Sequence, residues 1–371
     1  MGKVIICGTD MHDNSLVCRV AVDKEEAVTR RYKNTQVGRR RLFGQLRGLA
    51  RTRGCERIVV AYEASTHGFC LYDDCRDAGI ECFILAPTKM RKSRKDRKNK
   101  NDEQDAQLIL EALRGHLLAG NELPSIWIPD DETRADRETL RARLDLGQKL
   151  TTVKTQVQML LKAHRVRKPK KAGNSWTLPY RRWLTSLSKK DGGWPALATL
   201  LRQIKMLEQE VAILDREVAR LSETPRYAES ARELVKQLKG VGLLTAMVFL
   251  TEMGDLSRFS NRRQVGAYLG LVPSSHESGE ANDRKGHITR EGSGRVRRVL
   301  CQATWARITH NPEERDVYDR IVQRNPKHKK IAVVAVMRRL GVRMWHVGLA
   351  AQQRARVFPA REPDTVAEAA G

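Results

Sequence analysis

Residues 3–10 read KVIICGTD and residues 57–63 read RIVVAYE, and these two stretches decide the fold. Each is a short apolar run that ends at an acid, Asp10 in the first and Glu63 in the second. Runs of this kind are typical of strands that are buried in a sheet. Two further strands and two helices are predicted around them, at residues 16–22, 81–85, 37–53 and 68–78. This alternation indicates an α/β domain in the first third of the chain.

The acids stand where such a domain keeps a site. In open α/β sheets, sites form at the carboxyl ends of strands, which is where Asp10 and Glu63 lie. Residues 101–114 (NDEQDAQLILEALR) are predicted to form a helix, and the i, i+3 spacing places Asp102 and Asp105 on one face of it. Four carboxylates suit a pair of Mg²⁺ ions, which prefer oxygen ligands and align a phosphodiester for cleavage. The alternative for each acid is a helix cap or a surface ion pair.

Charge and length limit the class of protein. The chain has 371 residues, 69 Lys and Arg against 44 acids, and a formal net charge of +25. This excess favours DNA or RNA as the partner, and the length suffices for two or three domains. No apolar run approaches the roughly 20 residues of a membrane-spanning helix, and the first residues continue as a strand rather than a signal peptide. The seven cysteines form no C-x-x-C pair, so we expect free thiols in a reducing cytosol.

A basic run immediately precedes Asp102. Residues 89–100 hold eight Lys or Arg against the single Asp96. We expect this run to bring phosphates toward the acids. Its basic residues are Lys89, Arg91, Lys92, Arg94, Lys95, Arg97, Lys98 and Lys100.

A second basic segment contains aromatic residues. Residues 162–190 hold ten Lys or Arg, no acid, and Trp176, Tyr180 and Trp183, while Pro169, Gly173 and Pro179 are expected to break regular structure. Basic and aromatic side chains together suit a surface that follows a nucleic-acid backbone and stacks on its bases. The alternative is a solvated, flexible linker. The candidate contacts are Arg167, Lys168, Lys170, Lys171, Trp176, Arg181 and Arg182.

Helical patterns flank this segment. Residues 131–164 are charged, rich in Leu and almost free of Gly and Pro, which predicts one long helix. From Leu200 to Leu221, apolar residues alternate steps of four and three, the pattern of a coiled coil. A coiled coil between protomers and a helical hairpin within one chain both fit.

The last third begins near residue 231. Residues 238–250 (LKGVGLLTAMVFL) carry Gly240 and Gly242 before an apolar helix, a pattern similar to helix-hairpin-helix modules, in which helix-start amides hold a phosphate. Helix capping is the alternative. In residues 268–279 (YLGLVPSSHESG), Ser278 precedes Gly279 and can act as a nucleophile, although Ser-Gly is also an ordinary turn. Basic residues that can clamp a phosphate follow: Arg284, Lys285, Arg295, Arg297 and Arg298.

At these residues the chain resembles the RNA-guided DEDD transposases of bacterial insertion sequences, family 110, also described as bridge-RNA-guided recombinases. The matching motifs are GTD ending in Asp10, YEAS with Glu63, KNDEQDA with Asp102 and Asp105, the GVG at 240–242, and AYLGLVPSSHESG followed by RKGHITREGSGRVRRVL. The resemblance covers roughly residues 3–345. After Asp10 this sequence has Met-His-Asp-Asn, where relatives often carry a small residue and a Lys.

The resemblance implies a fold and an organisation. We expect an α/β RuvC-like (RNase H-like) DEDD domain over residues 1–125 and a helical coiled-coil connector with the basic aromatic linker over residues 126–230. A mainly α-helical transposase domain is expected over residues 231–352, before a disordered tail, residues 353–371. Asp10, Glu63, Asp102 and Asp105 are then the tetrad that binds Mg²⁺, and Ser278 is the nucleophile.

The resemblance also implies partners and a reaction. A noncoding bridge RNA would pair with donor and target DNA, a homodimer or higher homo-oligomer would act on them, and the bacterial cytoplasm, at the nucleoid, would be its location. Mg²⁺-assisted attack of Ser278 on a phosphodiester would form a phosphoserine intermediate before strand exchange, in a site that we expect two protomers to share. The alternatives are a RuvC-like, structure-selective endonuclease that uses water and a nucleic-acid-binding protein without catalysis.

Overall fold

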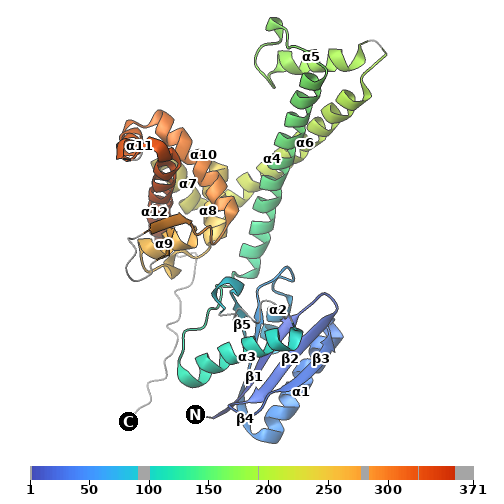
Figure 1. Cartoon of the computed structure of the whole chain (residues 1–371), viewed down its shortest axis with the longest axis vertical. Coiled ribbons are helices and arrows are strands. Elements are labelled where there is room, and N and C mark those ends of the chain that lie inside the picture. Colours follow the sequence, from blue (N-terminus) through green and yellow to red (C-terminus); the bar gives the residue numbers. More distant parts are fainter. Residues whose placement is uncertain (1, 91–100, 191, 277–283, 325, 356–371) are drawn as a thin grey trace. The chain divides into compact units, whose positions relative to one another are not determined.

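The computed structural model of the chain describes residues 2–90, 101–190, 192–276, 284–324 and 326–355 (Figure 1). Residues 1–128 and 129–371 form two compact units. Residues 353–355, which were predicted to begin a disordered tail, are instead the end of a helix, and residues 356–371 of that tail lie outside the described residues. No helix in the described ranges is long and apolar enough to cross a membrane. All seven cysteines lie within these ranges and are free thiols, as expected.

The N-terminal unit is built on a mixed five-stranded sheet with the order β3-β2-β1-β4-β5. The strand β1 is antiparallel to β2 and parallel to β4, β2 is antiparallel to β3, and β4 is parallel to β5. The strands are β1 (Lys3–Met11), β2 (Ser15–Val22), β3 (Val28–Lys33), β4 (Cys55–Glu63) and β5 (Glu81–Leu85). The α/β prediction for this part of the chain is confirmed, because all four predicted strands are present.

The strand β3 was not predicted. Its sequence, VTRRYK, carries three basic residues, and most of its side chains are exposed. It lies at the edge of the sheet, where charged side chains are usual because they discourage pairing with another chain.

Helices cover both faces of this sheet. The helices α1 (Gln36–Arg53) and α2 (Cys70–Asp77) pack on the face that carries Ile5, Cys7, Val60 and Tyr62. The helix α3 (Asp102–Ala119) lies across the opposite face, which carries Val4, Ile6, Val59 and Ala61 (Figure 1). Because side chains alternate along a strand, the acids at the ends of β1 and β4 belong to the face that α3 covers.

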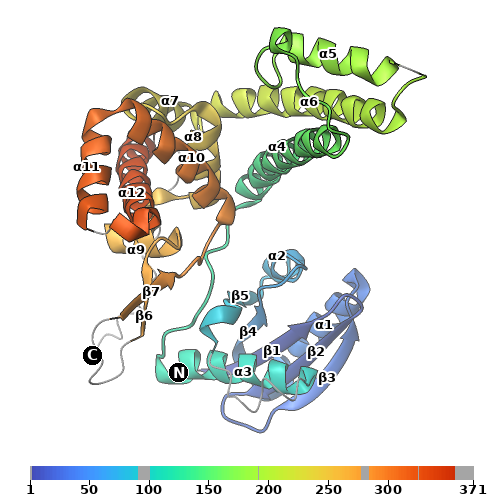
Figure 2. The same ribbon diagram turned by 45° about the horizontal axis from the view of Figure 1, so that its top comes forward.

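The C-terminal unit begins with a pair of long helices. The helices α4 (Asp131–Ala163) and α6 (Pro195–Ser222) run side by side (Figures 1 and 2). Val153, Val157, Ile204 and Leu207 are buried between them. The heptad pattern is therefore satisfied by a hairpin within one chain, and pairing between protomers stays a prediction.

One expectation for the basic segment was wrong. Part of it forms the helix α5 (Leu178–Lys189), where we expected no regular structure. Pro179 lies in the first turn of this helix, where a missing backbone N–H leaves no hydrogen bond unmade. Tyr180 and Leu184 then bury their side chains against the end of the α4–α6 pair.

The remaining helices pack around a second core of the C-terminal unit. This core includes Leu140 and Leu144 of α4 and Val218 of α6, so one end of each of these two long helices is packed in it. A two-stranded hairpin projects from this part of the unit (Figure 2). The elements are α7 (Ala228–Gln237), α8 (Leu243–Met253), α9 (Arg262–Tyr268), β6 (Pro273–His276), β7 (Arg284–Ile288), α10 (Gly294–His310), α11 (Pro312–Arg324) and α12 (Lys329–Ala355).

Candidate metal centre and nucleic-acid surfaces

The ends of two parallel strands place the first two acids of the tetrad. Thr9 of β1 is paired with Tyr62 of β4, so Asp10 and Glu63 occupy the next positions on neighbouring strands. Both lie on the face that α3 covers, by the alternation described above. Asp10 and Glu63 therefore lie on neighbouring strands and on one face, and their membership of a metal-binding tetrad stays a prediction.

A glycine lets α3 bring the other two acids to the same place. A Cβ atom built on Gly8 would lie 2.4 Å from the backbone oxygen of Ala106 and 2.4 Å from the backbone nitrogen of Leu110. Only a residue without a side chain permits this approach of helix to strand. Asp102 and Asp105 stand in the first turn of α3, immediately before Ala106. The contact at Gly8 thus fixes that turn beside the end of β1.

The first turn of α3 is stabilised locally. Asn101 caps the helix, because its side-chain oxygen accepts a hydrogen bond of 3.1 Å from the backbone nitrogen of Glu103. Acids in a first turn also interact favourably with the helix dipole. Both effects fix the helix start and hence the positions of Asp102 and Asp105.

His12 lies between two of the acids. Its Nε2 atom is 2.9 Å from Oδ2 of Asp10 and 3.3 Å from Oδ1 of Asp102. The ligand atoms of these three side chains all lie within 4.8 Å of one another. Sequence reasoning noted this histidine only as a departure from relatives. Its position two residues after a strand-end acid was the signal that it belongs to the site.

The electrostatics of Asp10 fit an anionic site. Burial raises the pKa of Asp10, the positive charge of His12 opposes that shift, and the charges of Asp105 and Asp102 raise the pKa further. The charges of Asp102 and Asp105 act on Asp10, which indicates that these three predicted acids lie near one another. A divalent cation is the ligand that relieves such repulsion, and the donor set of carboxylates with one imidazole fits it. The N-terminal unit can therefore hold a divalent metal ion.

The structure describes only part of the second predicted site, which consists of Ser278 and the basic residues that follow it. Ser278 lies outside the described residues, so its role stays a prediction. The hairpin of β6 and β7 leads into and out of that stretch, and Ser274 Oγ donates a hydrogen bond of 3.0 Å to the carbonyl of His287. Arg284 and Lys285 belong to β7.

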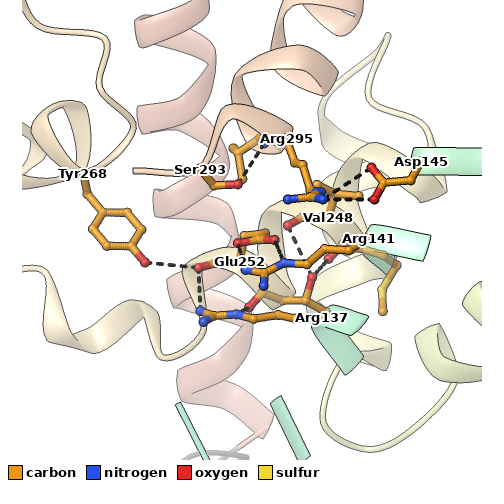
Figure 3. Close-up of polar contacts among 11 residues, drawn as sticks. Arg137, Arg141, Asp145, Val248, Glu252, Tyr268, Ser293 and Arg295 are labelled. Carbon is orange, nitrogen blue, oxygen red and sulfur yellow. Dashed lines mark hydrogen bonds and ion pairs between the residues drawn. The ribbon is translucent and has the colours of Figure 1, made fainter. Parts of the chain in front are cut away.

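The arginines that follow the hairpin have different surroundings. Arg295 Nη2 lies 3.1 Å from Oδ2 of Asp145 on α4 (Figure 3). Arg297 donates to three backbone carbonyls, the shortest contact being 2.8 Å to Glu291, and its burial and the nearby charge of Arg290 lower its pKa. Arg298 is exposed. Arg295 and Arg297 therefore have structural partners, and Arg298 has the accessibility that a phosphate contact requires.

A buried ion-pair network joins α4 to this part of the unit (Figure 3). Arg141 donates two hydrogen bonds, of 2.7 and 3.0 Å, to the buried carboxylate of Glu252. Arg137 donates to the backbone carbonyls of Thr251 and Glu252 at 2.8 and 2.7 Å. Tyr268, in the same motif as Ser278, donates to the carbonyl of Glu252 at 3.3 Å. The network fixes the base of α4 against the segment that carries this motif.

The basic segment of the α4–α6 pair uses its aromatic residues internally. Tyr180 is buried, and the rings of Trp176 and Trp183 pack on it, with centroids 5.5 and 5.4 Å away. Arg181 forms a bidentate pair with Glu208. These contacts leave no ring of this cluster fully exposed for stacking on a base. Among the predicted contacts of this segment, the residues with exposed charges are Arg167, Lys168, Lys170, Lys171 and Arg182.

The glycine turn before α8 lies beside a basic cavity. Gly240 has a φ of 90°, which favours glycine, and Gly242 precedes the first residue of α8. A cavity of about 760 Å³ next to the turn is lined by Lys236, Lys239, Arg307, His310, Arg343 and His346, with Glu313 among the remaining residues. Arg307 and Arg343 are paired with the buried Glu314, so Lys236 and Lys239 are the lysines that suit a phosphate there, and the role of the two glycines in holding one stays a prediction.

In the first basic run, Lys89 is exposed at the end of a short 3-10 helix. The other seven residues of that run, Arg91, Lys92, Arg94, Lys95, Arg97, Lys98 and Lys100, lie outside the described residues.

Comparison with known proteins covers both units. Residues 7–165 match a family model named for the DEDD transposase of IS110, and residues 232–319 match the model described as "Transposase IS116/IS110/IS902 family". The protein y4qE of Sinorhizobium fredii, which is named as a transposase, is 32% identical over 251 residues, 67% of this chain and 58% of that protein. The transposase for insertion sequence element IS1533 of Leptospira borgpetersenii is 23% identical over 254 residues, 67% of this chain and 70% of its own length.

Proposed function

Because the chain belongs to the IS110 family of transposases, we propose that it is a DNA recombinase that moves an insertion sequence under the guidance of a noncoding RNA. The observation that carries this proposal is the gathering of Asp10, Asp102 and Asp105 at the end of β1, beside the strand that ends at Glu63. The sheet order β3-β2-β1-β4-β5 supports a RuvC-like fold for the unit.

The proposed chemistry is a phosphoryl transfer to Ser278. The serine oxygen attacks a DNA phosphorus, its proton is removed, and the bond from phosphorus to the 3′-oxygen breaks, which leaves a phosphoserine and a free 3′-hydroxyl. A second 3′-hydroxyl then displaces the serine and joins donor to target. A divalent ion bound at the acids supplies charge stabilisation for the phosphate and the leaving oxygen.

Positive charge supports nucleic-acid partners. The chain carries a formal charge of +25, and the exposed basic residues of the α4–α6 pair, Arg167, Lys168, Lys170, Lys171 and Arg182, suit contacts with a phosphate backbone. Contacts of this kind read no sequence, which agrees with a protein whose sequence choice comes from a paired RNA. Sequencing the RNA that co-purifies with the full chain tests this part of the proposal.

Covalent trapping tests the reaction. Incubating the protein with labelled DNA and Mn²⁺ or Mg²⁺ should give a protein–DNA adduct that survives denaturation. Ser278→Ala should abolish the adduct, and Ser274→Ala should retain it, because Ser274 is already bonded to the backbone of β7. Cleavage that persists in Ser278→Ala without an adduct would instead indicate a nuclease that uses water.

A further experiment tests whether two protomers share the site. Asp102→Ala protein and Ser278→Ala protein are each expected to be inactive. Mixing them under conditions that exchange subunits should restore adduct formation, since one protomer then supplies intact acids and the other an intact serine. No recovery in mixed oligomers would contradict a shared site.

A further inference from the structure

One imidazole lies among the carboxylates of the N-terminal unit and has no place in the acid tetrad. His12 follows β1 in the turn that leads to β2, and its side chain is 37% exposed, so solvent and ions can reach it. Its Nε2 atom lies within 3.3 Å of a carboxylate oxygen from each of two separate elements, Asp10 on β1 and Asp102 on α3. An ion at that point would meet one nitrogen and two oxygen donors.

The backbone of His12 is held on both sides. Its N–H donates a hydrogen bond of 2.9 Å to the carbonyl of Ser15, and its carbonyl accepts one of 2.7 Å from Nδ2 of Asn34. Asn34 is fixed in turn, because its Oδ1 atom accepts a hydrogen bond of 2.7 Å from Arg39, which pairs with Asp74. This chain of contacts fixes the backbone from which the His12 ring extends toward Asp10 and Asp102.

The donor set differs from one made of carboxylates alone. Mg²⁺ is a hard ion that prefers oxygen and keeps much of its water, and imidazole adds little to its binding. First-row transition ions accept imidazole more readily than Mg²⁺ does, with Mn²⁺ the weakest binder of that series, so one nitrogen donor among carboxylates favours them over Mg²⁺.

We propose that His12 is a metal ligand together with Asp10 and Asp102, and that the site selects a first-row divalent ion such as Mn²⁺ over Mg²⁺. This inference rests on the proposed function, which requires a metal at the acids. It replaces the all-oxygen Mg²⁺ site expected from the sequence with a mixed nitrogen and oxygen site.

The competing role for His12 is that of a positive charge. A protonated ring between Asp10 and Asp102 would neutralise the two carboxylates in the metal-free protein. It would turn away from them when a metal ion binds. The two roles differ in what the ion contacts, because only a ligand places its nitrogen in direct contact with the metal.

Pulsed electron paramagnetic resonance of bound Mn²⁺ separates these roles. The full chain is prepared with natural ¹⁴N and with ¹⁵N-labelled histidine, and Mn²⁺ is added below one equivalent. We expect a nitrogen modulation that changes with the label, is lost in His12→Ala and in His12→Gln, and is kept in His116→Ala. His116 is the matched control, because it lies in the last turn of α3, the helix that begins at Asp102.

Metal competition gives a second readout. Loss of an outer partner of a metal ligand typically lowers affinity about 10- to 100-fold, so loss of a direct ligand in His12→Ala should lower Mn²⁺ affinity at least about tenfold more than Mg²⁺ affinity. Equal losses for the two ions would overturn the proposal.

The possible results of these experiments separate the ligand role of His12 from the metal-dependent function proposed for the chain. Mn²⁺ that binds to the wild-type chain without a histidine nitrogen overturns the role of His12 and leaves the acid site standing. The metal site of the proposed function is itself overturned by either of two results. One is that neither Mn²⁺ nor Mg²⁺ binds to the wild-type chain, and the other is that both ions bind to Asp10→Asn and Asp102→Asn as well as to the wild-type chain.

Discussion

The acids at the end of β1 in the N-terminal unit and two acids of the C-terminal unit, Glu252 and Asp145, have opposite surroundings. In the C-terminal unit, Glu252 receives two hydrogen bonds from Arg141, and Asp145 receives two from Arg295, at 3.1 and 3.3 Å. In the N-terminal unit, burial raises the pKa of Asp10, His12 opposes that shift, and the charges of Asp105 and Asp102 raise the pKa further. Acids that form ion pairs with arginines help to hold elements of the fold together. Acids that lie beside one another repel each other, and a bound cation relieves that repulsion. The difference predicts which acids support structure and which support chemistry.

Glu252 should give the largest loss of stability. Its side chain is 5% exposed, and Glu252→Ala leaves Arg141 without its partner beside a new cavity. Breaking a buried pair typically costs about 3–5 kcal/mol of unfolding free energy, and we expect the lower end, about 3 kcal/mol, since Arg141 is half-exposed. Urea unfolding of the full chain measures this loss.

An exposed pair on α6 is the control for Glu252. Glu217 lies 2.9 Å from Arg220, and both side chains are largely exposed. Such pairs contribute about 0.5 kcal/mol or less, so Glu217→Ala should change the unfolding free energy little. Similar losses in the two variants would show that the network in Figure 3 does not fix α4.

Gly8 should give an intermediate loss and also affect the metal. In Gly8→Ala the new methyl group meets backbone atoms of α3, which must shift, and overpacking of this kind costs about 1–3 kcal/mol. The shift moves Asp102 away from Asp10, so Mn²⁺ affinity should fall as well. Gly44→Ala is the control. A Cβ atom built on Gly44, which lies in α1, has no neighbour within 4 Å, and alanine at this helical position should stabilise the protein by roughly 0.5–1 kcal/mol. Unchanged Mn²⁺ binding in Gly8→Ala would contradict this role of the contact.

The sequence predicted the parts of the site that depend on regular structure. The strands ending at Asp10 and Glu63 are continuous apolar runs, because both of their faces are buried. The strand β3 escaped prediction because an edge strand needs no apolar pattern. The place of His12 beside the acids also escaped prediction, since its contact with Asp102 exists only after α3 packs on β1 at Gly8, which is a tertiary event.

Arginine partners were equally invisible in the sequence. Arg181 pairs with Glu208, 27 residues away, and Arg295 pairs with Asp145, 150 residues away. A basic run shows how many charges are present but does not show which of them the fold itself neutralises. For that reason some arginines predicted to bind nucleic acid have acidic partners within the chain.

Glu208 should give a smaller effect that depends on pH. Hydrogen bonds from Arg181 lower its pKa, and Lys154 lies 3.1 Å from it. Because the pKa in the folded state lies below the usual 4.5, the stabilisation is complete above that pH and is lost as the pH falls through the folded-state value. Glu208→Gln should cost about 1 kcal/mol at pH 7 and less at an acidic pH below the folded-state pKa of Glu208. An equal loss at both pH values, measured by urea unfolding, would show that packing rather than charge is responsible.

Asp102 should give the smallest change in the metal-free protein, and this near-zero result separates the two kinds of acid most sharply. Its side chain is 45% exposed, the helix start and His12 favour its charge and Asp10 opposes it, so Asp102→Asn should change the unfolding free energy by less than about 1 kcal/mol. Mn²⁺ at a hundredfold excess over its dissociation constant should stabilise the wild type by about 2.7 kcal/mol. Asp102→Asn should lose most of that increment, and Glu103→Gln should keep it, because Glu103 in the same turn pairs with Arg31 at 2.5 Å. If Asp102→Asn instead unfolds as readily as Glu252→Ala without metal, Asp102 belongs with the structural acids, and the contrast between the two units fails.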